Sequence, residues 1–148
     1  MMRFLMSPHR RRSAASIVAA VVSILLAACS VSKDFDLANA AIAHFRELMT
    51  AQKFDQIYSE SADDLKKSTP EPNLTRLLGA IDRKLGAFKS AQSNGWNLNY
   101  NASGTMVTLT LKSQFEKGTG VETFVYRISG GKALLASYRI NSDDLIIN

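Results

Sequence analysis

Apolar residues recur at helical spacing in three consecutive segments, which cover residues 35–52, 53–67 and 73–85. Each segment places its apolar residues on one face and its polar residues on the other, so the spacing predicts three amphipathic helices. The three apolar faces comprise Leu37, Ala41, Phe45 and Leu48; Phe54, Tyr58, Ala62 and Leu65; and Leu74, Leu77, Leu78, Ile81 and Leu85.

The ends of these helices also have sequence signals. Asp34 or Asp36 can cap the first helix and Asn73 the third, because a side-chain oxygen accepts the free N–H groups of a first turn. We expect the second segment to break near residues 59–61. Gly86 suits the end of the third helix because glycine readily adopts a positive φ.

The period then changes from helical to alternating, which predicts strands with one buried face. Turn signals at residues 103–104, 117–120 and 130–131 separate four such strands, and Leu145–Ile147 is expected to extend the sheet. Helices followed by strands predict an α+β domain, with helices packed on one face of a curved antiparallel sheet of about four strands. The alternating apolar residues are Trp96, Leu98 and Tyr100; Val107, Leu109 and Leu111; Phe124, Tyr126 and Ile128; and Leu134, Ala136, Tyr138 and Ile140.

The first 28 residues follow the pattern of a secretory signal. Residues 1–12 are basic, and residues 13–28 are apolar or small. This leader holds four arginines and no acidic residue, whereas the whole chain has 18 Lys and Arg against 13 Asp and Glu, a net charge of +5. Without the leader, 14 basic residues face 13 acidic ones. A nearly neutral body has no electrostatic reason to bind nucleic acid.

The segment Leu26-Ala27-Ala28-Cys29 stands at the end of the apolar run and contains the only cysteine of the chain. It resembles the lipobox of bacterial lipoproteins. The resemblance implies that a diacylglycerol is attached to the Cys29 sulfur and that the leader is cut between Ala28 and Cys29. It also implies that the new amino group can carry a fatty acid such as palmitate. The next residue is Ser30 and not aspartate, which implies delivery to the outer membrane rather than retention in the inner membrane.

Two other interpretations of this segment stay open. Residues 13–32 form an uncharged run of 20 residues, just long enough to span a membrane, although its Ala and Ser content makes it weakly hydrophobic. Alternatively, Cys29 is a small buried apolar residue. One cysteine excludes an intrachain disulfide, and with two histidines it cannot form a usual structural zinc site. We therefore expect no metal and no cofactor.

These patterns divide the chain into a leader (residues 1–28), a lipidated N-terminus with a short tether (29–34) and a single α+β domain (35–148). The five residues from Ser30 to Asp34 span at most about 18 Å, so the domain must lie close to the membrane. The expected location is the bacterial envelope, anchored by lipid and facing the periplasm.

The body of the chain, over residues 35–142, contains three sequence segments that are typical of one superfamily: Thr50–Tyr58, Arg83–Gly86 and Ala136–Ile140. With them it resembles the nuclear-transport-factor-2-like, or cystatin-like, superfamily, and in particular small envelope domains of unknown function. The resemblance implies a cone-like fold, in which a bent sheet wraps the first helix and leaves a pocket at the open end. Some relatives are enzymes, such as ketosteroid isomerase, and others bind ligands or partners or form dimers.

Six side chains are candidates for lining such a pocket. Amphipathic aromatic residues suit an apolar ligand, and the alternative is that they simply form the core. Glu116 and Glu122 flank the turn at residues 117–120, so we expect both carboxylates to be exposed, and no residue is assigned a catalytic role. The six candidates are His44, Tyr58, Trp96, Phe124, Tyr126 and Tyr138.

The main functional hypothesis is a non-catalytic envelope lipoprotein that binds a protein partner or a small apolar ligand near the membrane. One alternative is a small lyase- or isomerase-like enzyme, which requires a buried titratable group near the mouth of the pocket, such as His44 with Tyr58 or Tyr126. Another is a structural protein that forms homodimers through its sheet, which an apolar stripe on the outer sheet face would favour.

Overall fold

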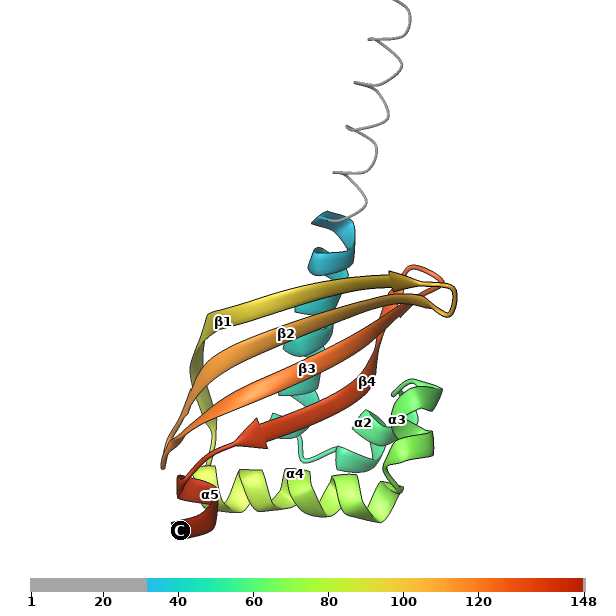
Figure 1. Cartoon of the computed structure of the whole chain (residues 1–148). Helices are drawn as coiled ribbons and strands as arrows, with labels where there is room; N and C mark the ends of the chain where they lie inside the picture. Colours follow the sequence, from blue (N-terminus) through green and yellow to red (C-terminus); the bar gives the residue numbers. More distant parts are fainter. Residues whose placement is uncertain (1–31, 148) are drawn as a thin grey trace, which may run out of the picture. The chain divides into compact units, whose positions relative to one another are not determined.

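The computed structural model describes residues 32–147. Residues Asp34–Asn148 form a compact unit, whose fold is shown in Figure 1. The predicted leader, the cleavage site at Ala28 and the lipidation site at Cys29 lie outside the described residues. The elements are a first helix over residues 32–50, α2 (Phe54–Ser59), α3 (Asp63–Ser68), α4 (Glu71–Leu85), β1 (Phe88–Asn101), β2 (Gly104–Phe115), β3 (Thr119–Ser129), β4 (Lys132–Asn141) and α5 (Asp144–Ile147).

The four strands form one antiparallel sheet in the order β1-β2-β3-β4. The sheet is curved and unclosed, and β1 and β4 are its edge strands (Figure 1). The prediction of an α+β fold with about four antiparallel strands is therefore confirmed. Gly130 and Gly131 connect β3 and β4 at φ values of 56° and 73°, the conformation that a two-residue hairpin turn requires.

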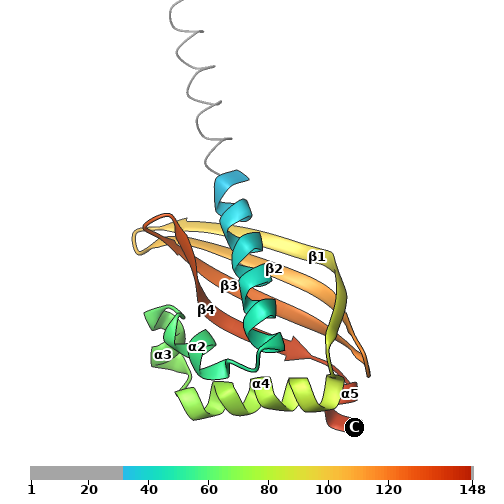
Figure 2. The same ribbon diagram turned by 180° about the vertical axis from the view of Figure 1, so that it is seen from behind.

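The first helix lies across one face of the sheet, which we call the inner face (Figure 2). Phe45 is buried there, and its ring centroid lies 5.2 Å from that of Phe124 and 5.1 Å from that of Tyr138. Each large apolar side chain buried in this way contributes about 1.5–3 kcal/mol. Packing of the first helix against the sheet therefore contributes to the stability of this domain.

Two of the predicted helix boundaries are confirmed. The second helical segment breaks into α2 and α3, and at the break the Ala62 N–H donates to the Leu135 carbonyl 2.9 Å away. Gly86 ends α4 with a φ of 73°. The start of α4 was predicted wrongly: the helix begins at Glu71 and not after Asn73, because Pro72 fits the first helical turn without losing a hydrogen bond.

Three further expectations are corrected by the structure. Asp34 and Asp36 do not cap the first helix, because the helix already includes residues 32 and 33. β1 begins at Phe88, eight residues before the alternating pattern starts at Trp96, because an exposed edge strand needs no buried face. Leu145–Ile147 belongs to α5 instead of the sheet, and the Lys84 ammonium holds this helix by donating to the Leu145 carbonyl at 2.7 Å.

Candidate functional site

The six predicted pocket residues do not surround one cavity. Phe124, Tyr126 and Tyr138 are buried in the core, where their rings contact one another, and Tyr58 packs partly buried against the same core. Trp96 is 64% exposed on β1. Only His44 and Tyr126 line a common cavity, and its volume of about 60 Å³ is far below the roughly 300–1,000 Å³ of typical ligand pockets.

The most unexpected feature of the interior is a buried ion pair between helix and sheet. Glu122 is fully buried at the inner face, so the expectation that it is an exposed turn residue was wrong. Arg46 of the first helix donates through both terminal nitrogens to the two oxygens of Glu122, with Nη1 3.0 Å from Oε1. The Tyr138 hydroxyl donates to Oε1 at 2.6 Å, and the Ser113 hydroxyl donates to Oε2. The carboxylate therefore has four donors.

This buried cluster, Arg46, Ser113, Glu122 and Tyr138, is largely shielded from solvent, and the Arg46 side chain is 12% exposed. The Phe88 ring covers the Arg46 guanidinium, whose central carbon lies 4.1 Å from the ring centroid. Burial and the neighbouring Glu122 charge raise the pKa of Tyr138 well above its ordinary value, which keeps its hydroxyl a neutral donor. A carboxylate that is saturated by donors and shielded from water cannot take a proton from a substrate. The cluster instead fixes the first helix to β2, β3 and β4.

His44 lies at the surface and forms an ion pair. Its Nε2 is 2.8 Å from Glu60 Oε2, its Nδ1 is 3.6 Å from Glu47 Oε2, and the side chain is 50% exposed. The hydrogen bond to Glu60 raises the pKa of His44 above its ordinary 6.5. The pKa of Glu60 is lowered from its ordinary 4.5, first by the hydrogen bond from Gln56 and then by that from His44.

We predict that Glu60→Gln lowers the pKa of His44 toward 6.5, because it removes the main partner of the imidazolium. The ion pair stabilises the folded state to its full extent between pH 4.5 and 6.5, which are the pKa values of Glu and His in the unfolded chain. That stability is lost as the pH rises through the folded pKa of His44 or falls through that of Glu60. The gain is less than about 1 kcal/mol because both groups are half exposed. NMR titration of the imidazole measures the shift, and Glu47→Gln is the control with the smaller effect.

The opposite, outer face of the sheet carries a row of side chains in one register across all four strands. Gln92 pairs with Lys112, Lys112 with Val121, and Val121 with Asn141. Strands lie about 4.8 Å apart, so the row extends over about 14 Å. Gln92, Lys112 and Asn141 are exposed and form no side-chain hydrogen bond within the described residues, so their polar groups are free to bind a partner.

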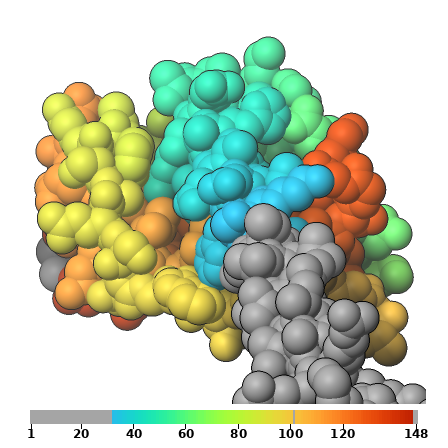
Figure 3. All heavy atoms as spheres, turned by 90° about the horizontal axis from the view of Figure 1, so that it is seen from above, coloured from blue at the N-terminus to red at the C-terminus, as the bar shows by residue number. Residues whose placement is uncertain are grey.

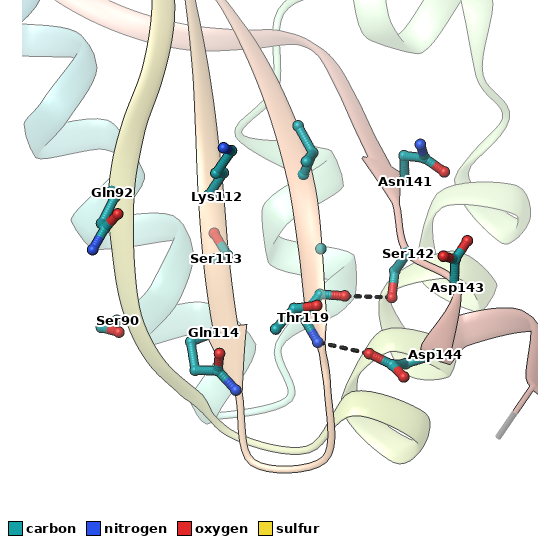
Figure 4. Close-up of a pocket in the computed structure, with 12 residues that line it drawn as sticks. Ser90, Gln92, Lys112, Ser113, Gln114, Thr119, Asn141, Ser142, Asp143 and Asp144 are labelled. Atoms are coloured by element: carbon teal, nitrogen blue, oxygen red, sulfur yellow. Dashed lines mark hydrogen bonds between the residues drawn. The ribbon is translucent and has the colours of Figure 1, made fainter.

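The row crosses a hollow of about 730 Å³ (Figure 4). One wall of the hollow is fixed by the segment that follows β4. Asp144 accepts the Thr119 N–H at 2.8 Å, and the Ser142 hydroxyl donates to the Thr119 carbonyl at 2.6 Å. These two hydrogen bonds hold the segment after β4 against the start of β3. The two amides and the ammonium group of the row form no such bonds in the described part of the chain and stay available to a partner. We call Gln92, Lys112, Val121 and Asn141 the polar row.

Sequence reasoning missed both the buried cluster and the polar row. Strict alternation along β3 would have placed Glu122 on the same face as Phe124 and Tyr126, and this signal was available. The polar row depends on strand register, which the turns alone did not define.

No protein-family model and no curated protein matches this chain in the comparisons. Among residues 32–147, no helix is both long and apolar enough to cross a membrane. The same residues contain no group of three or more His, Cys, Asp or Glu side chains that could hold a metal ion.

Proposed function

We propose that this protein is a lipid-anchored lipoprotein of the bacterial envelope, with acyl chains on Cys29 after cleavage behind Ala28. The leader and its lipobox support this proposal from the sequence. The packing of the domain is consistent with it. The buried apolar core begins at Ala38, and residues 34–148 form a compact unit of their own. Removing residues 1–28 would therefore take no described core residue from the domain.

We further propose that the domain is a binding module and not an enzyme, in agreement with the nearly neutral charge of the mature chain. The cavity beside His44 is small, and the buried carboxylate of Glu122 is saturated by its four donors. The enzyme alternative requires a substrate-sized pocket around a titratable group. Tyr126 lines the small cavity beside His44. Tyr138 also borders a hollow of about 590 Å³, but its hydroxyl donates to the buried Glu122 carboxylate and is therefore occupied.

The polar row on the outer face is the observation that supports a protein partner as the ligand. A row of two amides and one ammonium group, about 14 Å long, presents donors and acceptors to an extended polar chain rather than to a small apolar molecule. The tether of at most about 18 Å would hold this surface near the membrane. A partner that works at the same membrane would then meet the polar row at high effective concentration.

Site-specific photo-crosslinking in living cells tests this surface. A photoreactive residue at Gln92, inside the hollow, is expected to crosslink the lipidated protein to one discrete protein. The same residue at Asn97 is the matched control, because Asn97 lies on the same strand in the outward-facing register but outside the hollow. Adding Lys112→Glu is expected to abolish the Gln92 crosslink without unfolding the protein, since Lys112 is exposed.

Equal crosslinking from Gln92 and Asn97 would contradict the proposal. A product containing two copies of this chain would instead support the structural, dimerising alternative.

A further inference from the structure

A patch of three aromatic side chains joins the start of the first helix to the exposed edge strand β1. The ring centroids of Phe35 and Trp96 lie 4.9 Å apart in an edge-on contact. The Tyr100 hydroxyl donates to Asp34 Oδ2 at 3.4 Å. Trp96 is 64% and Tyr100 55% exposed, although tryptophan and tyrosine usually bury most of their surface. Figure 3 shows the start of the helix (blue) beside β1 (yellow) on one face. We call Phe35, Trp96 and Tyr100 the aromatic patch.

The covalent chain limits how far this patch can be from Cys29. Phe35 follows Cys29 by six residues, which span at most about 22 Å when fully extended. Trp96 contacts Phe35, and Tyr100 contacts the adjacent Asp34, so the whole patch is held at the tethered end of the domain. A lipid on Cys29 would therefore bring the patch within reach of the bilayer surface.

We propose that the aromatic patch inserts into the headgroup region of the membrane that holds the lipid on Cys29, and so fixes the orientation of the domain. This inference rests on the lipid anchor of the proposed function. Tryptophan and tyrosine concentrate at membrane–water interfaces, because each combines an apolar ring with a hydrogen-bonding group. An exposed patch of two such residues and a phenylalanine matches that chemistry.

The size of the patch favours a lipid interface over a second copy of the chain. Asn97 and Asn99 alternate with Trp96 and Tyr100 along β1 and face the outer side of the sheet, so the patch itself consists of only three aromatic side chains. A stable dimer buries about 800 Å² on each partner, with a mainly apolar centre. With the patch inserted, the outer sheet face and its polar row remain outside the membrane and accessible to a partner.

Trp96 is the only tryptophan of the chain and reports this contact directly. The lipidated protein, purified from envelopes, is reconstituted into phosphatidylethanolamine–phosphatidylglycerol vesicles with acyl chains brominated close to the carbonyl. We expect the emission to shift to the blue relative to that of a water-exposed tryptophan, and bromine to reduce its intensity. The Tyr100→Trp, Trp96→Phe variant is expected to be quenched to a similar extent.

The Phe88→Trp, Trp96→Phe variant is the matched control. Phe88 is also an exposed aromatic residue of β1, but it lies eight residues away, which is about 25 Å along a strand. We expect no quenching from this position. If bromine quenches Trp96 of the lipidated protein no more than it quenches the tryptophan of the control variant, the proposed membrane contact is overturned, and the lipid anchor is not. If the protein has the mass of a dimer and its emission shifts to the blue without bromine quenching, the patch contacts a second copy of the chain and the membrane contact is overturned.

The acyl mass on Cys29, read on the same sample, tests the proposed anchor separately. A sample without acyl mass overturns the anchor, and this inference with it. A lipidated sample that lacks quenching leaves the anchor standing.

Discussion

Replacing Glu122 with leucine is expected to lower the free energy of unfolding by about 3–5 kcal/mol, because it leaves the buried Arg46 charge without its partner. The Tyr138 and Ser113 hydroxyls lose their acceptor in the same step. Moving the Arg46 guanidinium into water would break its contact with the Phe88 ring. Urea unfolding followed by far-UV circular dichroism measures the change.

Two further variants test whether the loss of stability in Glu122→Leu comes from the unpaired Arg46 charge or from replacing any acidic residue near this turn. Glu116→Leu changes the other acid beside the β2–β3 turn, whose side chain is 49% exposed, and is expected to cost less than about 1 kcal/mol. Arg46→Met combined with Glu122→Leu removes both charges and is expected to be clearly more stable than Glu122→Leu alone. If Glu122→Leu is as mild as Glu116→Leu, the cluster does not hold helix and sheet together.

Replacing Cys29 with serine is expected to abolish lipid attachment completely, because a serine hydroxyl replaces the only thiol in the chain. Cells fed an alkyne-tagged fatty acid should label the wild-type protein and leave Cys29→Ser unlabelled. The variant should also keep its leader and therefore run at a higher mass. The core lies within residues 34–148, so its folded domain should unfold at the same urea concentration as that of the wild type.

Ser30→Ala is the matched control for this experiment, because it changes the next residue and leaves the thiol in place. It is expected to label like the wild type. Equal labelling of Cys29→Ser and wild type would show that the acyl chains are attached elsewhere.

The fold could be predicted from the sequence because burial is periodic in both halves of the chain. Helical spacing defined the first helix, α2, α3 and α4, and alternation with glycine turns defined the central parts of the four strands. The first half of β1 has no such signal. All its residues from Phe88 to Asn94 are exposed, so neither an apolar face nor a charge pattern marks them as a strand.

The candidate site could not be predicted in the same way. Arg46 and Glu122 are 76 positions apart, and no local pattern shows that two opposite charges will be buried together. The polar row likewise exists only through the register of three strand pairs. Trp96 shows the opposite problem. Its alternating position suggested burial, yet β1 is an edge strand that the first helix covers only in part, and the side chain stays exposed.

Native mass spectrometry of the protein extracted from its own membranes in mild detergent tests the central claim most directly, since it reads the N-terminus and any bound partner together. A chain that begins at Cys29, carries acyl chains and retains a protein partner is the predicted result. A lipidated chain that never retains a partner would contradict the binding function. A chain that still begins at Met1 and carries no lipid would contradict the lipoprotein itself.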